Sequence, residues 1–600
     1  MAYNIVMDRD NKNSEKLDHI RHSLAHLLAM AVLKKFPKAE LGIGPVIEHG
    51  FYYDFKLPKA ITEDNLKELE QTIRELIAQN LEFSGEEVTA QKAKNIFKGQ
   101  PFKLDLIKDF VKEKKHLTTY SICPQPITYN LKPKTCFTDL CRGGHVESTS
   151  EINPDAFKLD RIAGAYWRGD EKNPMLTRIY GLAFETKKEL DAHLAFLEEV
   201  KKRDHKKLGV ELDLFTFSEL VGPGLPLWTP KGTLLRDTLD NLVWKLRKEK
   251  GYERVDIPHI TKKELYEKSG HWDKFKQELF RITTREGHLF AMKPMNCPHH
   301  TQIYARRQWS WRELPQQYAS TTKVYRDEQS GELAGLSRVL SITQDDAHVF
   351  CRQSQVKEEI EKIWDIVNAF YHAVGFEKLD VRLSLHDPKE PKKYLGSPAV
   401  WEQAERTLRE LVKEKGVHAT EAAGEAAFYG PKIDFMAHDS IGREWQVATI
   451  QLDMNLPERF DLYCIDEHGK KERIVMLHAA IMGSIERFLS ILIEHYAGAF
   501  PFWLAPVQVA ILPVSEKFLE YGRLILEKIS AHDIRAELDA SNETLGKKIR
   551  SAEMQKIPYL FVVGEREQES QTVAVRERGV GDKGQMALMH FLDTVKKEIS

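Results

Sequence analysis

The sequence lacks the features that a secreted, membrane-embedded or disulfide-stabilised protein needs. Its 600 residues include six cysteines, too few for a disulfide framework. No apolar run approaches the roughly 20 residues of a membrane span. The N-terminus is polar and has no apolar secretion core. We therefore expect a cytoplasmic protein that does not enter membranes.

An excess of charge of one sign is also missing. The chain carries 88 basic and 90 acidic residues, for a net charge of −2, so its overall charge does not indicate nucleic-acid binding. A near-neutral protein can still bind nucleic acid through local basic clusters, such as residues 201–207 and 547–550. Taken alone, each cluster is better explained as a solvated helix face. The length predicts about three or four domains.

Residues 317–350 predict two strands joined by a polar loop. Arg326 and Glu328 lie two residues apart near the end of the first strand, so on a strand both side chains would project to one face. A fixed guanidinium binds phosphate or carboxylate through paired hydrogen bonds, and a neighbouring carboxylate can accept a hydrogen bond from a base amine. The pair therefore suits ATP, although a lone Arg-x-Glu is more often an exposed pair on a hairpin.

Two other segments change the interpretation of this hairpin. Residues 255–258, Val-Asp-Ile-Pro, belong to a largely apolar segment with a proline, and residues 483–488 form a small-residue turn that opens a helix with an arginine. The order of proline segment, hairpin and helix resembles motifs 1, 2 and 3 of class II aminoacyl-tRNA synthetases. With Met-Asn-Cys-Pro at 295–298 and Gln-Asp-Asp-Ala-His at 344–348, nearly the whole chain resembles the threonyl-tRNA synthetases.

The resemblance implies an α+β multidomain protein with an antiparallel-sheet class II catalytic core. We expect a polar tail at 1–15, an α+β editing domain at 16–185, a linker helix at 186–207, the catalytic domain at 208–502 and a C-terminal α/β anticodon-binding domain at 503–600. Alternating short apolar strands and helices after residue 503 independently favour an open α/β domain. Relatives usually carry another small domain before the editing domain, and we expect that domain to be absent here.

Cys297, His348 and His478 are the candidate zinc ligands. Their wide separation forms no recognisable local zinc motif, and each residue alone is more often structural; the resemblance assigns all three to one site. A Cys/His/His site with an open face is of the catalytic type. There, threonine can offer its amino nitrogen and hydroxyl oxygen to the metal, and Asp346 can accept the hydroxyl proton.

Such a site has consequences for specificity. Valine has the shape of threonine but presents a methyl group where the metal needs a ligand, and a polar site rejects an analogue that lacks its hydroxyl by ~10⁴–10⁵. Serine keeps both donor groups and lacks only a methyl, a difference of ~1–3 kcal/mol. A zinc-gated site therefore implies a second site that removes serine from the tRNA.

The resemblance assigns further residues to the catalytic site. Arg326 would bridge the threonine carboxylate and the α-phosphate of ATP, and Glu328 would contact the adenine amine. Arg487, helped by Arg338, would hold the adenine and the terminal phosphate, with Mg²⁺ on the phosphates. His271, otherwise a packing histidine, is a candidate to deprotonate the tRNA ribose. The residues expected to line the amino-acid and adenylate pocket are Gln344, Asp346, Tyr429, Lys432, Gln446 and Gln451.

Two residue pairs with the same spacing indicate a second site. His22 and His26 share one face of a predicted helix, and Cys141 precedes His145 by four residues. Serine at position 23 excludes the metalloprotease motif, which needs glutamate there. The four side chains could hold zinc or form a metal-free hydrolytic pocket in which imidazole activates water. The resemblance implies editing of seryl-tRNA(Thr) by His22, His26, Tyr53, Asp139, Cys141 and His145.

The predicted activity is that of a threonine–tRNA ligase, which uses L-threonine, ATP and tRNA(Thr), binds one zinc per subunit and forms a homodimer near residues 255–258. Asn542, Glu567 and Arg576 match family positions that contact anticodon bases, which proteins read through polar edges and stacking. Without the resemblance, these three would be ordinary surface residues.

Several positions depart from the family pattern. Gly144 stands where proline is expected, His299 replaces a glycine, residues 340–342 read Leu-Ser-Ile instead of Arg-Gly-Phe, and Ala479 stands where arginine is common. Because the predicted zinc ligands and Arg326 are kept, we expect activity to be kept. ATP or the tRNA end could be held differently, and His299 could be a spurious additional metal candidate.

Two alternatives fit the same motifs. One is an RNA-binding regulator on a synthetase scaffold that has lost its chemistry, which threonine-dependent pyrophosphate release would exclude. The other is a synthetase for another amino acid, which a comparison of serine, proline and threonine would test. A free-standing metal hydrolase fits only the first third of the chain.

Overall fold

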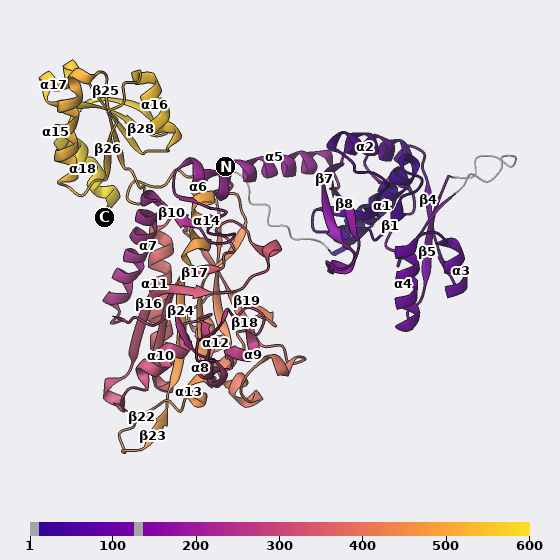
Figure 1. Ribbon diagram of the computed structural model, residues 1–600, viewed down its shortest axis with the longest axis horizontal. Helices are drawn as coiled ribbons and strands as arrows, with labels where there is room; N and C mark the ends of the chain where they lie inside the picture. The colour runs from indigo at the N-terminus through magenta and orange to yellow at the C-terminus, as the bar shows by residue number, and fades with distance from the viewer. Residues whose placement is uncertain (1–10, 125–135, 600) are drawn as a thin grey trace. The chain divides into compact units, whose positions relative to one another are not determined.

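The computed structural model describes residues 11–124 and 136–599 (Figure 1). The chain divides into two compact units, Met1–Glu198 and Glu199–Ser600. Over the described residues, no helix is long and apolar enough to cross a bilayer.

The first unit is built around helix α1 (Asn11–Lys35). Leu24, Leu28 and Val32 are fully buried, at the spacing expected for one face of a helix, and they pack against strand residues such as Phe51 and Ile179. The predicted polar tail ends at residue 15, but the helix already begins at Asn11, so residues 11–15 belong to the helix. The remainder of the predicted tail, residues 1–10, lies outside the described residues.

Two antiparallel sheets complete this unit. One has the order β1-β3-β8-β7 with β2 on β3, and the other has the order β4-β5-β6. Helix α1 contacts α2, β2, β3 and β8. The bounds are β1 Glu40–Leu41, β2 Val46–Ile47, β3 Gly50–Lys56, α2 Glu63–Ile77, β4 Glu82–Glu87, α3 Ala90–Ile96, α4 Pro101–Lys112, β5 Thr118–Cys123, β6 Phe137–Leu140, β7 Phe157–Tyr166 and β8 Met175–Ala183.

A disulfide joins Cys123 and Cys136, with their Cα atoms 4.7 Å apart. Both residues lie one position beyond the paired residues Ile122 and Phe137 of β5 and β6, so the bond joins the two strands at the end where the segment that connects them begins. The sequence led us to expect no disulfide framework. The structure has this single bond, and the other four cysteines are not disulfide-bonded.

The predicted linker helix is two helices, α5 (Lys187–Arg203) and α6 (His205–Glu211). Asp204 breaks the helix because its side chain accepts a hydrogen bond from the backbone N–H of Lys206 and so caps the second helix. The basic run of this segment is therefore divided between a helix end and a helix start.

An eight-stranded sheet forms the centre of the second unit, in the order β11-β16-β17-β24-β21-β20-β18-β19. It is antiparallel except at the β11–β16 and β18–β19 pairs. The bounds are β11 Glu253–Arg254, β16 Gln316–Tyr325, β17 Ser341–Cys351, β18 Leu379–Leu385, β19 Ala419–Ala423, β20 Lys432–His438, β21 Glu444–Asp453 and β24 Val475–Ser484.

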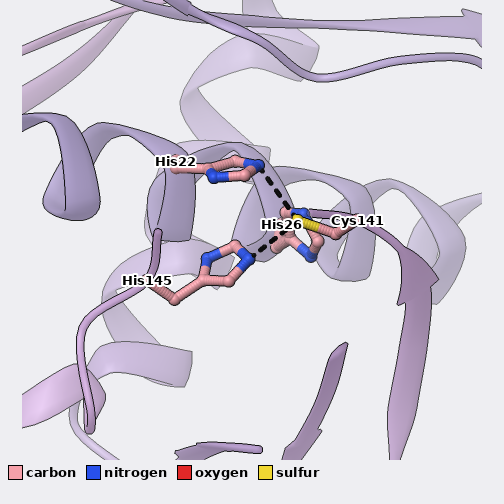
Figure 2. A group of neighbouring side chains, drawn as sticks. All are labelled: His22, His26, Cys141 and His145. Atoms are coloured by element: carbon pink, nitrogen blue, oxygen red, sulfur yellow. Dashed lines mark hydrogen bonds between the residues drawn. The ribbon is translucent and has the colours of Figure 1, made fainter. Parts of the chain in front are cut away.

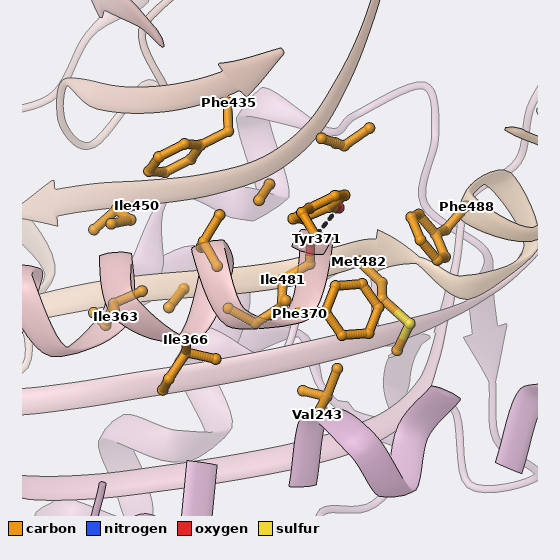
Figure 3. Close-up of a cluster of buried hydrophobic side chains, with 14 of the residues drawn as sticks. Val243, Ile363, Ile366, Phe370, Tyr371, Phe435, Ile450, Ile481, Met482 and Phe488 are labelled. Atoms are coloured by element: carbon orange, nitrogen blue, oxygen red, sulfur yellow. Dashed lines mark hydrogen bonds between the residues drawn. The ribbon is translucent and has the colours of Figure 1, made fainter. Parts of the chain in front are cut away.

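Three helices, α7 (Pro230–Glu249), α11 (Val356–Ala373) and α14 (Ile485–Tyr496), pack on one face of this sheet. Ile363, Phe370 and Tyr371 of α11 lie among side chains of the sheet and of the other two helices (Figure 3). The hydroxyl of Tyr371 donates to the carbonyl of Ile481 on β24 at 2.7 Å. Because this face is filled by apolar side chains, the opposite face is left for the polar residues described below.

The last part of the chain carries the predicted α/β pattern. Its sheet has the order β26-β25-β27-β28-β29, with the first three strands parallel and the last two added antiparallel. The bounds are β25 Val509–Pro513, α15 Leu519–Ser530, β26 Ala536–Leu538, α16 Leu545–Met554, β27 Tyr559–Val563, α17 Glu565–Ser570, β28 Thr572–Glu577, β29 Gly581–Ala587 and α18 Leu588–Ile599.

Candidate active sites

The three predicted zinc ligands lie together in the second unit. Cys297 begins α10 (Cys297–Tyr304), and His348 and His478 are directly paired residues of β17 and β24. Since paired residues of adjacent strands project to the same face, the register brings the two imidazoles together. The ligand atoms of all three lie within 4.8 Å of one another, and all three residues are buried.

The ring nitrogens of His348 and His478 that face away from this group each contact a side chain outside it. Nδ1 of His348 lies 2.8 Å from Nδ1 of His300, and Nε2 of His478 lies 2.9 Å from Oδ2 of Asp453. The two facing nitrogens, Nε2 of His348 and Nδ1 of His478, are 3.1 Å apart. Two nitrogens on one tetrahedral zinc lie about 3.3 Å apart at the usual Zn–N distance, so the spacing fits a shared metal.

The environment of the cysteine also fits a metal. Burial, together with the negative charges of Asp346 and Asp453, raises the pKa of the Cys297 thiol well above its ordinary value. A thiolate there needs a compensating positive charge, which a divalent metal supplies. Among the described residues, no fourth cysteine, histidine or acid joins the group, which leaves a side open as in catalytic zinc sites.

Asp346 lies beside this group. It is two residues before His348 on β17 and so shares its face, with Oδ1 3.8 Å from Nε2 of His348. Its Oδ2 accepts a hydrogen bond from Nδ2 of Asn296 at 3.1 Å. Burial raises the pKa of Asp346 to about 6, against the opposing effects of His478 and Asn296.

Tyr429 and Gln451 form the adjoining wall. The Tyr429 ring stacks on the His478 ring with centroids 4.6 Å apart, and its hydroxyl donates to Oε1 of Gln451 at 2.5 Å. Gln451 is the residue paired with His478 on β21. The aromatic ring therefore covers one of the predicted metal ligands, and the hydroxyl and amide add polar groups next to it.

The remaining predicted pocket residues extend along the same sheet. Lys432 and Gln446 both contact Asp434, at 2.9 Å from Nζ to Oδ2 and 2.8 Å from Nε2 to Oδ1. Gln344 lies two residues before Asp346 on β17 and is paired with Ser484 of β24. These residues line a longer polar surface than the metal group alone.

The structure corrects the strand argument for Arg326 and Glu328. Strand β16 ends at Tyr325, and the backbone N–H of Glu328 donates to the carbonyl of Arg326 at 3.0 Å. The backbone N–H of Arg326 still donates to the carbonyl of Leu340 at 3.0 Å, but the turn takes Glu328 away from the strand, so the proximity of the two residues comes from the loop and not from the alternation of a strand. Nη2 of Arg326 lies 3.3 Å from Sδ of Met295, and its buried Nε has no acceptor among the described residues.

Glu328 and Arg338 contact each other across the loop. Nε and Nη2 of Arg338 donate to Oε2 of Glu328 at 2.9 and 2.6 Å. Arg487 is in the first turn of α14, where its backbone N–H donates to the N-cap hydroxyl of Ser484 at 3.2 Å. Its side chain is exposed, so it is free to contact a ligand at the start of that helix.

His271 approaches the metal group from a second direction. It begins α9 (His271–Lys274), and its Nε2 lies 3.5 Å from Sγ of Cys297, while its Nδ1 contacts the hydroxyl of Ser269 at 2.9 Å. Burial lowers its pKa to about 3, with His478 the next cause. The ring is neutral and fully buried among aromatic side chains in this conformation.

The second predicted cluster forms in the first unit (Figure 2). Sγ of Cys141 lies 3.4 Å from Nε2 of His22 and 3.1 Å from Nε2 of His145, and His26 completes the group within 4.8 Å. His22 and His26 project from α1, whereas Cys141 and His145 follow β6. Burial is the first cause that lowers the pKa of His145 to about 2 and raises that of Cys141 to about 11, which favours neutral side chains.

Asp139 joins this cluster to a buried lysine that the sequence analysis missed. The Tyr53 hydroxyl donates to Oδ2 of Asp139 at 2.5 Å, and Lys103 Nζ lies 2.5 Å from Oδ1. Nε2 of His26 is 4.0 Å from the same carboxylate. Lys103 is 2% exposed. Its sequence signal is weak but real, since it lies next to Phe102 on the buried side of the amphipathic helix α4.

Comparisons with known proteins agree with this arrangement. Family models for the tRNA synthetase class II core domain (G, H, P, S and T), the anticodon binding domain, and the threonyl and alanyl tRNA synthetase second additional domain match residues 280–496, 508–598 and 120–180. A threonine–tRNA ligase from Gloeobacter violaceus is 48% identical over 577 residues, which is 95% of this chain and 90% of the relative.

Another threonine–tRNA ligase, from Porphyromonas gingivalis, is 47% identical over 96% of this chain and 87% of its own. The chain belongs to the threonyl-tRNA synthetase family. Its class II core, anticodon-binding domain and editing domain confirm the predicted multidomain α+β architecture. A crystal structure described as the RNA binding domain of threonyl-tRNA synthetase from Cryptosporidium parvum is 34% identical, with a TM-score of 0.63, over 66% of this chain and 98% of that one.

Membership of the threonyl-tRNA synthetase family gives the chain its activities, threonine ligation to tRNA and editing. The residues predicted to contact the anticodon stay a prediction. Asn542 is exposed before α16, Arg576 is on β28, and Glu567 accepts the backbone N–H of Gly564 at the start of α17. No hydrogen bond or ion pair joins the three within the described part of the chain.

The departures from the family pattern have local explanations. Gly144 has φ of +81°, which proline cannot adopt. His299 faces Tyr266, with ring centroids 6.2 Å apart, and is not part of the group formed by Cys297, His348 and His478, which agrees with its description as a spurious metal candidate. Ala479 is buried in the apolar core on the helix-covered face. The structure gives no account of Leu340, Ser341 and Ile342 as a replacement.

Proposed function

We propose that this threonyl-tRNA synthetase selects threonine with a zinc ion held by Cys297, His348 and His478. The observation that carries the proposal is the convergence of one thiol and two oriented imidazoles on a common point with an open side. When bound, zinc supplies a Lewis acid for the amino nitrogen and the hydroxyl oxygen of threonine.

The protein side chains complete the selection. Asp346, held by Asn296, accepts the hydrogen bond of the threonine hydroxyl. Tyr429 and Gln451 close the adjoining wall. A valine side chain leaves the Asp346 carboxylate without its donor in a buried site, and such a loss is costly. Serine satisfies the same contacts, which is why an editing site is needed.

Activation of threonine requires its carboxylate to meet the α-phosphate of ATP. Arg326 neutralises the charge that develops between them, and its unpartnered buried Nε supports an anionic ligand at this position. Glu328 contacts the adenine amine, and Arg338 and Arg487 bind phosphate and base, with Gln344, Lys432 and Gln446 along the adenylate. Mg²⁺ accompanies the phosphates. His271 receives the proton of the attacking tRNA ribose hydroxyl.

The editing site hydrolyses the ester of seryl-tRNA(Thr). The imidazoles of His22, His26 and His145 lie around Cys141, and burial keeps them neutral, so they can orient the attacking water as hydrogen-bond acceptors. The buried carboxylate of Asp139 orients this group, and it is held in place by the ammonium of Lys103 and the hydroxyl of Tyr53. The same four ligand atoms can also bind a metal, and a chelator distinguishes these two mechanisms.

The partners follow from the domains and the surface. Asn542, Glu567 and Arg576 read the anticodon of tRNA(Thr). A second copy of the chain packs against the segment 255–258. Exposed apolar side chains earlier in the catalytic domain add to the surface that it covers: Leu220 is fully exposed, and Phe217, Val221, Leu227 and Leu234 are 37–44% exposed. We expect this homodimer in the cytoplasm, where tRNA and ATP are available.

The experiment measures zinc content and threonine-dependent ATP–pyrophosphate exchange for the wild-type protein and for Cys297→Ala. We expect about one zinc per subunit and exchange with threonine but not valine in the wild type, and loss of both zinc and exchange in the variant. A wild-type protein that exchanges with threonine but holds no zinc would refute the zinc proposal. Absence of any exchange would favour an RNA-binding regulator.

A further inference from the structure

His205 lies outside both sites yet contacts the loop that carries the proposed ATP-binding residues. This residue is the first of α6 and is 4% exposed. Its Nε2 accepts a hydrogen bond from the backbone N–H of Leu336 at 3.1 Å. Leu336 lies in the segment 326–340 between β16 and β17, hereafter the ATP loop, and it is fully buried.

The orientation of the His205 ring is fixed on its other side. Nδ1 lies 2.6 Å from Oε1 of Glu494, near the end of α14, and the backbone N–H of His205 donates to the same oxygen at 3.2 Å. Burial opposes the charged form of Glu494, but hydrogen bonds from His205 and Arg443 outweigh it and lower the pKa of the carboxyl. Since a carboxylate only accepts, Nδ1 carries the proton and Nε2 is left as the acceptor for Leu336.

The chain around His205 is also anchored. Arg203, two residues earlier, donates to the carbonyl of His495 at 2.9 Å and to the hydroxyl of Ser440 at 2.8 Å. Asp204 caps α6. The backbone that presents the imidazole is therefore held to the end of α14, a helix whose first turn carries Arg487.

The ATP loop itself is shaped to meet this imidazole. Gly335 has φ of +55°, and a Cβ atom at this position would lie 2.4 Å from Nε2 of His205. Only glycine allows the backbone to approach the ring so closely. The hydroxyl of Ser337 lies 3.0 Å from that of Ser490 on α14. The next residue, Arg338, makes the paired contact with Glu328.

We propose that His205 is a positioning residue that holds the ATP loop, through the Leu336 N–H, in the conformation that keeps Arg338 and Glu328 at the ATP site. This inference rests on the proposed roles of Arg338 and Glu328. His205 touches neither substrate, so its removal weakens the use of ATP and leaves the binding of threonine unchanged.

The test uses two isosteric replacements in the full-length protein. The amide nitrogen of His205→Asn can replace Nδ1 toward Glu494 but provides no acceptor for Leu336, whereas the amide oxygen of His205→Gln can replace Nε2 as that acceptor. In threonine-dependent exchange we expect the KM for ATP to rise about tenfold in His205→Asn, because a buried N–H loses its partner. We expect a smaller rise in His205→Gln and an unchanged KM for threonine in both.

The chain offers a matched control. Nδ1 and the backbone N–H of His386 contact Oε1 of Glu405 at 2.6 and 3.0 Å, as those of His205 contact Glu494, but the His386 ring packs on Tyr394 and Trp401. His386→Asn should keep the wild-type KM for ATP. Gly335→Ala tests the same contact from the loop side, keeps the His205–Glu494 pair, and should raise the KM for ATP.

Arg338→Ala distinguishes the proposed role of Arg338 in binding ATP from the proposed role of His205 in positioning the ATP loop. If it raises the KM for ATP while His205→Asn and Gly335→Ala do not, the positioning role of His205 is wrong and the role of Arg338 stands. If Arg338→Ala has no effect, both are wrong. A parallel rise of the KM values for ATP and threonine, with a lower melting temperature, would also overturn the inference, because it indicates a merely structural residue.

Discussion

The two clusters of cysteine and histidine differ in what holds their side chains. In the second unit, His348 and His478 come from paired strands, and their outer nitrogens contact His300 and Asp453. In the first unit, His22 and His145 contact the Cys141 thiol directly, and Nδ1 of the buried His26 has no partner in the described part of the chain.

This difference separates a ligand set from a reactive pocket. Outer hydrogen bonds fix the tautomer of a metal ligand and aim its lone pair, so the group of Cys297, His348 and His478 has the support that a metal-binding site needs. The group around Cys141 instead rests on a buried Lys103–Asp139 ion pair and on contacts between its own side chains. We therefore expect a metal ion to be essential for the group of Cys297, His348 and His478 and dispensable for the group around Cys141.

Substituting alanine for Cys297 or for Cys141, one at a time, should have the largest effect on activity. Cys297→Ala should lose zinc and reduce threonine-dependent exchange to background, because no remaining group replaces the thiolate. Cys141→Ala should retain the bound zinc and the threonine-dependent ATP–pyrophosphate exchange, but it should lose the deacylation of seryl-tRNA. Metal analysis with both assays measures the contrast. Loss of deacylation on treatment with a chelator that leaves the protein folded would erase the distinction.

Removal of the buried lysine should have the next largest effect. Lys103→Met leaves the Asp139 carboxylate without its cation in a buried site, and we expect deacylation of seryl-tRNA to fall by about a hundredfold with unchanged exchange. Lys92→Met, which removes an exposed lysine paired with Glu86 in the same unit, is the control. Equal deacylation rates in the two variants would show that the ion pair is not part of the editing site.

Replacing the carboxylate behind a zinc ligand should have a moderate effect. Asp453→Asn keeps the shape but weakens the hold on His478, and we expect the zinc dissociation constant to rise about 10–100-fold. Competition with a chelating dye measures this change. Asp365→Asn, at an exposed ion pair with Lys250, should leave zinc affinity as it is, and a similar affinity in both variants would count against an oriented ligand set.

The smallest effect is expected at Ser23. Its hydroxyl lies 3.4 Å from Nδ1 of His145 and accepts the backbone N–H of Val146 at 3.1 Å. Ser23→Ala removes one modest hydrogen bond to the ring, so deacylation should fall by about threefold to tenfold. A loss as large as that of Lys103→Met would indicate that His145, like the zinc ligands, depends on outer support.

The sequence predicted the two clusters because each of its motifs matched a family pattern, and the structure brings the members of each cluster together. The strand-based explanation of Arg326 and Glu328 was wrong, since β16 ends before them and a tight turn follows. Lys103 was missed because its only signal is its place on the buried side of the amphipathic helix α4. His300 and Asp453 were missed because an isolated histidine or aspartate carries no periodic signal. The single linker helix was also wrong, because the capping role of Asp204 competes with its place in a helix.

The sequence by itself determined the order of the domains and the types of residue in each site, because local spacing and motif order are properties of the chain. Tertiary structure alone decided which nitrogen of each histidine faces inward, which charges are buried together, and which loop His205 meets. Those facts depend on strand register and side-chain packing between segments that are far apart in the chain, where desolvation makes each hydrogen bond and charge decisive.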